Sequence, residues 1–349
     1  MHTTKRLTVL FALVLFISVQ CHGEPRTQVH YINVGQAEAI LLEFEHEAML
    51  IDAGGECTCD DRDREHLLSY LDEFFERRSD LTEGNRGRIH TIVISHPHID
   101  HTMLLMDVMK RYKVVNFVDG GNEFGSGIVQ IWAARYYAQK HGINYYAIAD
   151  VDNTNGFVNA ALKSLHDKSP EVDLKFLAGS RGCRNANNDS LVLWAKIRNV
   201  TFLFTGDDEA IKKEDDPCEP EIPFVLKRFA QTSVLNVDVY KVGHHGSYNG
   251  SSIDLMKAMT PKISVISAGL YNQQGPGDFH AWQYGHPRES AIKTIEAYTT
   301  NMREPIAVTT MDASFKPHMN RVIKNAVYCT CWDGDVVIEV KNDSSIAVH

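Results

Sequence analysis

The chain has no excess of positive charge and, beyond its N-terminus, no long hydrophobic run. Its 349 residues include 35 Lys and Arg against 45 Asp and Glu, a formal net charge of −10. An acidic chain attracts polyanions weakly, so we expect no extended nucleic-acid groove. Low-complexity segments and short-period repeats are also missing, which excludes fibrous and solenoid architectures. The hydrophobic content of 44% is enough to bury a core, and we interpret residues 24–349 as a single domain.

The N-terminal segment carries the one strongly apolar run. Lys5 and Arg6 precede the apolar stretch 7–19, which is the pattern of a secretory signal peptide. We expect residues 1–23 to be removed after Gly23 and the mature protein to be extracellular or periplasmic, with an uncleaved anchor as the alternative. No other run has the length needed to cross a membrane, so we expect no stable membrane span after cleavage.

The cysteines fit an oxidising compartment. One of the seven, Cys21, lies in the signal segment, and an even number remains. An even count in a secreted chain indicates disulfides. We expect the two C-x-C pairs, 57/59 and 329/331, to clip the first strands to the last, and Cys183 to pair with Cys218. Thiolate metal binding is the alternative, and the distance of these pairs from the histidine cluster disfavours it.

The hydrophobic pattern alternates between strands and helices. Short β-prone runs broken by glycine or charged turns indicate strands, and a 3.6-residue apolar period indicates helices. Strands are expected near residues 29–36, 39–44, 48–52, 89–95, 114–118, 145–148, 190–195, 200–204, 237–242, 263–267 and, last, 336–340, with helices near 64–78, 103–112, 128–141 and 290–298; the acidic stretch 214–223 is expected to be a surface loop. Two meanders interleaved with helices predict a four-layer αββα sandwich, in which two mixed sheets are flanked by helices.

The sequence His96-Pro97-His98-Ile99-Asp100-His101 follows the apolar strand 89–95. Imidazole nitrogen and carboxylate oxygen are ligands that zinc and similar first-row metals prefer. His96 and His98 lie two residues apart on an extended segment and can face one metal ion. Asp100 and His101, after the turn, can face a second.

Two further strands end in metal-ligand residues. The strand 200–204 runs into Thr205-Gly206-Asp207, where the glycine permits a tight turn and the Asp207 carboxylate can bridge two metals. The strand 237–242 runs into Gly243-His244-His245-Gly246. Alternation along a strand puts the two histidines on opposite faces, so we expect only one of them to bind metal and the other to contact substrate or a carboxylate.

Three other residues are candidates for supporting roles. Asp52 ends a strand and is expected to orient a ligand histidine. His286, in Tyr284-Gly285-His286-Pro287, is expected to contact the substrate or its leaving group, and a plain surface position is the alternative. Ser190 follows Asn188-Asp189 at the start of a strand and is expected to support a metal ligand.

Taken in order, these motifs resemble the metallo-β-lactamase superfamily over residues 29–300. The stretches that carry the resemblance are 34–36, 50–55, 96–101, 188–193, 205–207, 241–247 and 284–287. They resemble the branch that includes the soluble domain of bacterial competence (DNA-uptake) proteins and the phosphorylcholine esterases. The resemblance implies the αββα fold and two Zn²⁺ ions per chain, with Mn²⁺ or Fe²⁺ as alternatives.

The chain departs from that branch at two places within these motifs. The branch has Gly and Asp after Val-Gly-Gln, where this chain has Ala37 and Glu38. Many superfamily members also place a histidine between the first cluster and the bridging aspartate, where this chain offers Asn187 and Asn188. The first metal is therefore expected to have only His96, His98 and Asp207 as protein ligands, with water completing its coordination.

A dinuclear site of this kind predicts a hydrolase. Metal-activated hydroxide would attack an ester, amide or phosphodiester without a covalent intermediate, and Asp100 or a neighbouring histidine would move protons. By resemblance the substrate is a small phosphoester or phosphodiester. A lactam, lactone or thioester is the alternative for the same site. A catalytically silent domain that binds metal or a partner is the alternative from another class.

Overall fold

The computed structural model of the 349-residue chain describes residues 27–55, 62–149, 168–214, 216, 218–270 and 281–349. The predicted signal segment and the Cys57/Cys59 pair lie outside these residues. In the part of the chain that is described, no helix has the length and apolar character needed to cross a membrane.

The larger sheet runs in the order β17-β16-β1-β2-β3-β5-β6-β7, and β4 pairs with β5. Pairing is antiparallel from β17 to β3 and parallel from β3 to β7. The strands are β1 (Gln28–Tyr31), β2 (Ile40–Glu43), β3 (Ala48–Ile51), β4 (Thr82–Glu83), β5 (Arg86–Val93), β6 (Lys113–Asp119), β7 (Asn144–Ala147), β16 (Val336–Val340) and β17 (Ile346–Val348).

The second sheet runs in the order β15-β12-β11-β10-β9-β8 and is also mixed, because β8-β9-β10 is antiparallel and β10-β11-β12-β15 is parallel. A separate hairpin, β13-β14, stands beside it. The strands are β8 (Val172–Ala178), β9 (Val192–Ile197), β10 (Val200–Phe204), β11 (Val239–Lys241), β12 (Ile263–Ile266), β13 (Met302–Met311), β14 (Pro317–Asn325) and β15 (Val327–Cys329).

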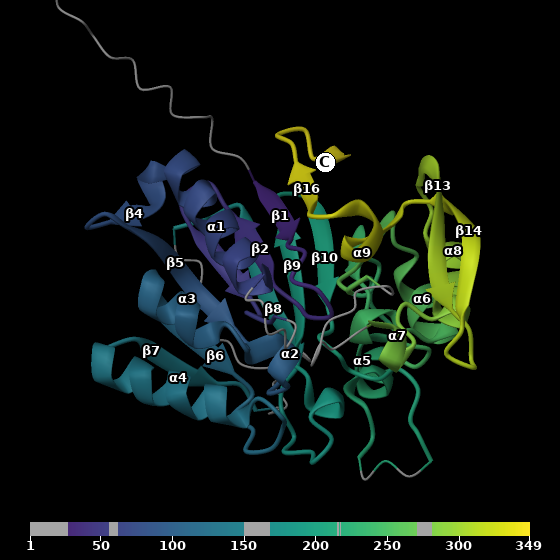
Figure 1. The fold of residues 1–349 in the computed structure, drawn as a ribbon, viewed down its shortest axis with the longest axis horizontal. Coiled ribbons are helices and arrows are strands. Elements are labelled where there is room, and N and C mark those ends of the chain that lie inside the picture. The colour runs from purple at the N-terminus through teal and green to yellow at the C-terminus, as the bar shows by residue number, and fades with distance from the viewer. Residues whose placement is uncertain (1–26, 56–61, 150–167, 215, 217, 271–280) are drawn as a thin grey trace, which may run out of the picture.

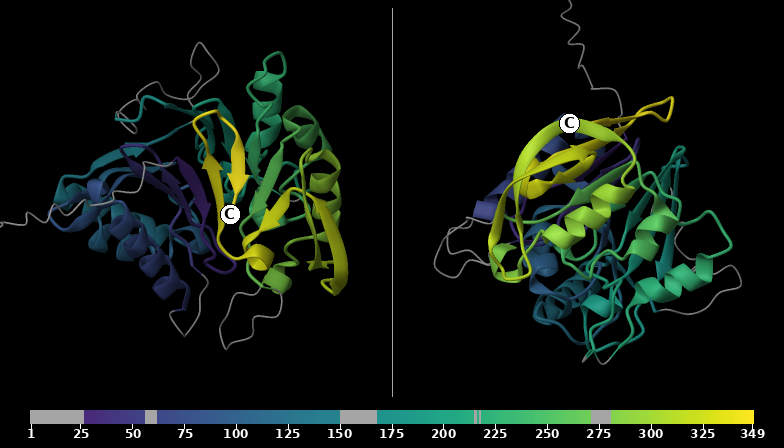
Figure 2. Two further views of the ribbon diagram at one scale, coloured as in Figure 1. Left: turned by 90° about the horizontal axis from the view of Figure 1, so that it is seen from above. Right: turned by 90° about the vertical axis from the view of Figure 1, so that its right-hand side faces the viewer.

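Helices cover the outer face of each sheet, and Figures 1 and 2 show the two helical layers on opposite sides of the molecule. The predicted four-layer sandwich is confirmed. The helices are α1 (Arg62–Arg77), α2 (Ile99–Thr102), α3 (Leu105–Arg111), α4 (Ile128–His141), α5 (Glu221–Phe229), α6 (Ile253–Met259), α7 (Ala281–Tyr284), α8 (Glu289–Tyr298) and α9 (Thr330–Asp333), with short 3₁₀ turns η1 (Ser79–Leu81), η3 (Asn187–Asp189) and η4 (His244–Gly246).

Three apolar clusters hold these layers together. Side chains such as Ile40 and Phe202 fill the space between the two sheets. Helix α1 buries Leu67, Leu71 and Phe74, spaced for one helical face, against the larger sheet. Helices α5, α6 and α8 pack on the second sheet in the same way. Because β5 is covered on both faces, its residues from Ile89 to Val93 are buried continuously rather than in alternation.

The structure corrects three details of the sequence analysis. The stretch 214–223 is not only a loop, because α5 begins at Glu221, with Asp208 accepting hydrogen bonds from the backbone N–H of Glu221 and Ile222. The strand 336–340 is followed by β17, which pairs with it. The β13-β14 hairpin had no counterpart in the predicted elements.

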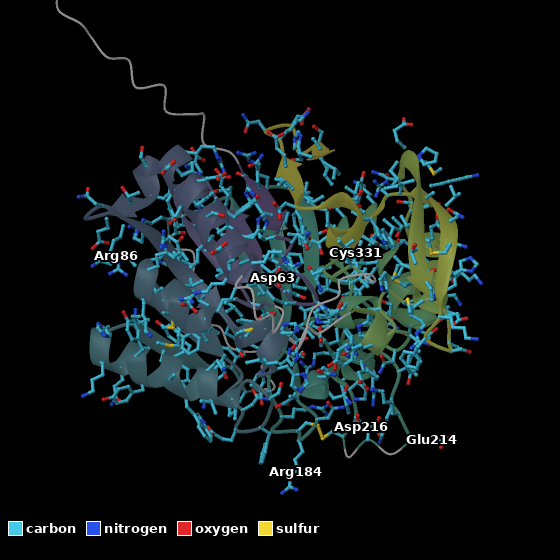
Figure 3. The ribbon with its side chains drawn as sticks, viewed as in Figure 1. Asp63, Arg86, Arg184, Glu214, Asp216 and Cys331 are labelled. Atoms are coloured by element: carbon cyan, nitrogen blue, oxygen red, sulfur yellow. A yellow bond between two sulfur atoms is a disulfide. The ribbon has the colours of Figure 1, made fainter. Side chains whose placement is uncertain are left out.

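The cysteine pairing is partly as expected. Cys183 and Cys218 form a disulfide, as predicted. Cys329 pairs with Cys331, so the expected link from this pair to the first strands is wrong. The turn from β15 into α9 brings these two Cα atoms within 5.1 Å, which is a normal separation for a disulfide. Figure 3 labels Cys331 in the interior of the view and Asp216, which neighbours the other disulfide, near the lower edge of the molecule.

Removal of the Cys183–Cys218 bond is expected to lower stability substantially. The bond closes a loop with a sequence separation of 35 residues, and loops of this size contribute about 2–4 kcal/mol through the entropy of the unfolded chain. The free energy of unfolding of the Cys183→Ser/Cys218→Ser variant, measured in denaturant, tests this. The Cys329→Ser/Cys331→Ser variant is the control, because its bond closes almost no loop. Equal losses in both variants would contradict the expectation.

Candidate metal centre

The candidate site residues follow the carboxyl ends of parallel strands in both sheets. The His96–His101 segment follows β5, Asp207 follows β10, and His244-His245 follows β11. Gly206 makes the turn before Asp207 with a φ of +52°, and a Cβ there would lie 2.8 Å from that of Ser95. Residues more than 100 apart in sequence therefore meet where the two sheets face each other.

Four of the predicted ligands form one buried cluster: Asp100, His101, Asp207 and His245. The Oδ2 atom of Asp207 lies 3.3 Å from His101 Nε2 and 3.2 Å from His245 Nε2. Asp100 Oδ2 lies 3.3 Å from His245 Nε2 and 4.0 Å from His101 Nε2. Two carboxylates and two imidazoles thus point at one position, as the ligands of a single metal ion do.

The other two histidines of the segment lie beside this cluster. His96 Nε2 and His98 Nδ1 are 3.1 Å apart, so both rings present a nitrogen to the same position. His96 Nε2 is 4.0 Å from Asp207 Oδ2. Asp207 therefore lies between the His96/His98 pair and the Asp100/His101/His245 group, where a bridging carboxylate is expected.

The donor atoms suit a metal ion. Within the described residues, His101 Nε2, His245 Nε2 and Asp207 Oδ1 are buried atoms without an aligned hydrogen bond. Leaving a buried polar atom unpaired costs about 1–3 kcal/mol, and a metal coordinated by these lone pairs would satisfy all three. The donor set of nitrogen and carboxylate oxygen therefore fits a first-row divalent ion.

The electrostatics of the cluster favour positive charge at its centre. Burial opposes ionisation of every member, but the mutual attraction of the carboxylates and imidazoles outweighs it. It holds the pKa of Asp207 well below its usual range and raises the pKa of His245 to about 10. The pKa of His101 is raised well above its usual value in the same way, by Asp207, Asp52 and Asp100. A field that stabilises protons on these imidazoles also stabilises a metal cation in their place.

Asp52 lies behind His101, at the end of β3. Its Oδ2 accepts a hydrogen bond of 2.7 Å from His101 Nδ1, and its Oδ1 accepts one from the backbone N–H of Ser95. The Ser95 hydroxyl donates to Asp52 and lies 3.0 Å from His96 Nδ1. Asp52 therefore fixes the proton of His101 on Nδ1 and leaves Nε2 free to bind metal, which is the arrangement typical of metal-ligating histidines.

Substitution of Asp52 is expected to weaken metal binding without removing a ligand. In Asp52→Asn the partner of His101 Nδ1 loses its charge, and loss of such partners lowers metal affinity about 10–100-fold. Competition with a chromophoric chelator measures this affinity directly. The exposed Asp254→Asn variant is a control for the change in net charge. Unchanged affinity in Asp52→Asn would contradict the assigned role.

The structure separates the two adjacent histidines. His245 joins the cluster, and its Nδ1 lies 2.8 Å from the carbonyl oxygen of Ser267, which leaves Nε2 to face the carboxylates. His244 points elsewhere, with Nε2 3.3 Å from Asn187 Nδ2 and Nδ1 3.9 Å from Glu209 Oε1. The two side chains point in different directions, but not because of strand alternation as expected. The strand β11 ends at Lys241, and both histidines adopt positive φ values in η4.

The remaining predicted residues border the cluster. The Ser190 hydroxyl accepts a hydrogen bond of 3.2 Å from the backbone N–H of Asp207. His286 is buried and lines a pocket of about 320 Å³ that also contains His98, Asp100, Asp207 and His245. The simple surface position considered for His286 is therefore wrong. The pocket gives a small ligand access to the predicted metal ligands.

Three functional candidates were not assigned from the sequence. Gln36 lines the same pocket and donates to His286 Nδ1 at 3.1 Å, while its Oε1 accepts from the backbone N–H of Gly269. Beneath the site, Glu38 and Lys241 form a fully buried ion pair of 2.6 Å. The Val-Gly-Gln motif and the unusual Glu38 were visible in the sequence. Their partners were not, because they lie more than 200 residues away.

Comparison with known proteins agrees with this geometry. Residues 32–125 match the family model described as the metallo-beta-lactamase superfamily. This region contains β5 and the His96–His101 segment. The resemblance to the metallo-β-lactamase superfamily that was inferred from the motifs is therefore confirmed by the match over residues 32–125.

Two curated relatives align along most of the chain. ComE operon protein 3 of Bacillus subtilis is 24% identical over 92% of this chain, and Recombination protein 2 of Haemophilus influenzae is 21% identical over 91%. The chain spans about a third of the length of these relatives, 36% and 34%. Among solved structures, the metallo-β-lactamase fold protein YhfI from Bacillus subtilis aligns with a TM-score of 0.39 at 11% identity, covering 78% of this chain and 94% of that one.

Proposed function

We propose that this chain is a secreted, zinc-dependent hydrolase of a small phosphoester or phosphodiester, with two metal ions bound per chain. The observation that carries the proposal is the cluster of Asp100, His101, Asp207 and His245, with several donor atoms buried and unpaired among the described residues, beside a pocket that His98 also lines. His96 lies next to His98 and Asp207. The predicted signal segment and the Cys183–Cys218 disulfide support secretion.

The protein supplies position and charge. Metal ions held here would supply an acidified water as nucleophile and Lewis-acid stabilisation of the phosphoryl or carbonyl oxygen. Asp207 would contact both ions, and Asp52 holds His101 in the tautomer that can bind metal. Asp100 has an oxygen that is open to the pocket and is placed to move a proton between water and substrate.

His286 is suited to donate a hydrogen bond to the substrate. The Gln36 carboxamide is fixed because its Oε1 accepts from Gly269, so its Nε2–H₂ group faces His286 Nδ1. His286 Nδ1 is thus an acceptor, and the ring proton lies on Nε2. Burial, with the charges of His244 and His245, holds the pKa of His286 well below its usual value, so the ring is neutral near pH 7. A neutral donor at this position can bind a developing oxyanion or the leaving group.

The pocket and the net charge both favour a small substrate. A cavity of about 320 Å³ accommodates one phosphoester group with modest substituents. The net charge of −10 gives no bulk attraction to a long polyanion. The same metal pair could hydrolyse a lactam, lactone or thioester, and the test below separates these substrates.

The test combines metal content with turnover of bis(p-nitrophenyl) phosphate by the purified protein, with and without a chelator. Two metal ions per chain and chelator-sensitive turnover are the expected results. Two metals without phosphodiester turnover would overturn the phosphoester assignment, and a lactam and a thioester would then be assayed. Metal binding without turnover of any of them would favour a silent metal-binding domain, and absence of both would overturn the proposal.

A further inference from the structure

Asn187 begins η3 in the connection between β8 and β9, and its side chain lines the same pocket as His98 and His244. Its carboxamide interacts with the His98 ring, and its Nδ2 lies 3.3 Å from His244 Nε2. The amide therefore lies beside the His96/His98 pair, the side of the site that has fewer protein ligands.

The carboxamide oxygen of Asn187 is buried and makes no aligned hydrogen bond within the described residues. An amide nitrogen can only donate, so His244 Nε2 accepts from the Asn187 NH₂ group at 3.3 Å. Asn187 Oδ1 is then an acceptor, and among the described residues it is a buried atom without a hydrogen-bond partner. The turn at η3 does not use it, since Asn185 Oδ1 accepts from the backbone N–H of Asn187.

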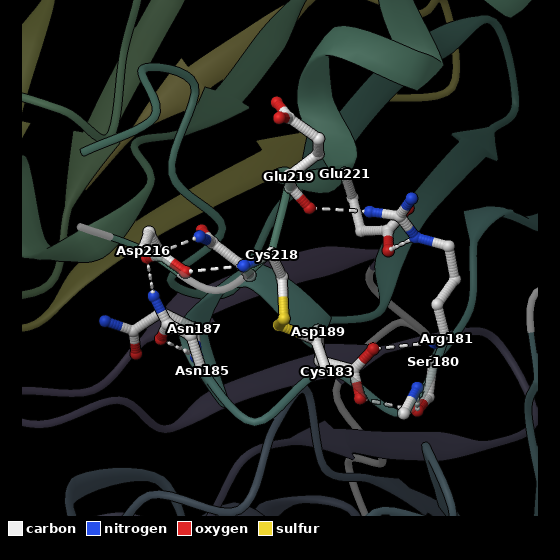
Figure 4. The surroundings of a disulfide bond; sticks show 12 residues. Ser180, Arg181, Cys183, Asn185, Asn187, Asp189, Asp216, Cys218, Glu219 and Glu221 are labelled. Atoms are coloured by element: carbon white, nitrogen blue, oxygen red, sulfur yellow. Dashed lines mark hydrogen bonds and ion pairs between the residues drawn. A yellow bond between two sulfur atoms is a disulfide. The ribbon is translucent and has the colours of Figure 1, made fainter. Parts of the chain in front are cut away.

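The loop that presents Asn187 is held on both sides, as Figure 4 shows. The Cys183–Cys218 disulfide ties it to the loop after β10, and Asp216 of that loop accepts hydrogen bonds from Asn185 and Asn188. On its other side, Asp189 accepts from Ser180 Oγ and from the backbone N–H of Arg181. These contacts fix the backbone of Asn187 before any ligand arrives, which is a requirement of a metal ligand carried on a loop.

We propose that Asn187 Oδ1 is a ligand of the first metal ion, so that this site has two imidazole nitrogens and oxygens from Asp207 and Asn187. The inference rests on the proposed metal centre and replaces the expectation that water alone completes the first site with a protein ligand. Carboxamide oxygen is a weaker and harder ligand than imidazole. The first metal is therefore bound less tightly than the second, which has Asp100, His101, Asp207 and His245.

Zn²⁺ alone is the probe, titrated into the metal-free full-length mature chain in competition with a chromophoric chelator. Two affinities are expected in the unmodified protein. Asn187→Ala is expected to weaken the lower-affinity site about 10–100-fold and to leave the higher-affinity site unchanged. Asn187→Asp, which keeps an oxygen at the same position and adds charge, is expected to retain or increase the affinity. Co²⁺ absorption provides a second readout, since loss of one ligand changes the d–d band of one ion only.

Arg184→Ala is the matched control, because Arg184 is exposed on the same loop and does not line the pocket. Wild-type affinities in Asn187→Ala would overturn the inference. An equal loss in Asn187→Ala and Asn187→Asp, or in Arg184→Ala, would also overturn it, since it would indicate a role in loop shape alone. The titration does not depend on turnover. A protein that binds zinc through Asn187 but hydrolyses nothing would overturn the proposed function and leave this inference standing.

Discussion

Replacement of Asp207 by asparagine is expected to lower hydrolysis by orders of magnitude and to reduce the metal content from two ions to one or none. Asp207 lies between the two groups of ligands. Its Oδ2 atom is 3.2 Å from Nε2 of His245, 3.3 Å from Nε2 of His101 and 4.0 Å from Nε2 of His96. The amide has the same shape but lacks the charge that offsets two cations. Metal catalysis contributes several kcal/mol, so turnover is expected to fall about 10³-fold.

Metal analysis and turnover of bis(p-nitrophenyl) phosphate measure the two effects on the same sample, and circular dichroism checks that the variant is folded. Glu214→Gln is the matched control, because it removes the same charge from an exposed position on the loop that follows Asp207. Full turnover with two bound ions in Asp207→Asn would rule out a dinuclear centre built on this carboxylate.

The adjacent residues His244 and His245 are expected to respond very differently to substitution by alanine. His245→Ala removes the imidazole whose Nε2 faces Asp100 and Asp207, so the second metal ion should be lost and turnover should fall about 10³-fold. His244→Ala removes a ring that contacts Asn187 and lies near Glu209. It should keep the second ion and lower turnover roughly tenfold, the effect of losing one supporting contact.

Each variant controls for the other, because both remove the same side chain from the same turn. Metal stoichiometry is the decisive measurement, since it separates loss of a ligand from loss of a substrate contact. Equal, mild effects of the two substitutions would remove this turn from the metal centre. Loss of the second ion in His244→Ala alone would reverse the assignment.

Much of the candidate site could be predicted from the sequence, because most of its residues stand in short, recognisable patterns. An apolar strand followed at once by histidine or aspartate predicts a ligand at a strand end. The rule placed His96, His98, Asp100 and His101 after β5, and Asp207 after β10. The same strands, read with the helical periods between them, predicted the sandwich. These patterns involve only residues that are close in sequence, so they can be recognised without knowing which strands pair with each other.

The elements that escaped prediction have weak or misleading local signals. The β13-β14 hairpin exposes apolar side chains such as Met302 and Met319 and has no clear alternation of buried and exposed residues. Helix α5 starts inside an acidic, proline-containing stretch and depends on Asp208, thirteen residues before Glu221, to satisfy its first N–H groups. Cys329 and Cys331 pair with each other because a turn into α9 brings them together.

By itself the sequence determined the ligand types and the strand ends that carry them, because local patterns of apolar and polar residues fix both. Tertiary structure alone decided which of the candidate ligands lie together. His245 rather than His244 joins Asp100 and Asp207, and Asn187 comes to lie beside His98. These choices depend on two sheets meeting across more than 100 residues of chain and on positive φ values in one turn. Neither the meeting of the two sheets nor the conformation of this turn can be predicted from the residues adjacent in sequence.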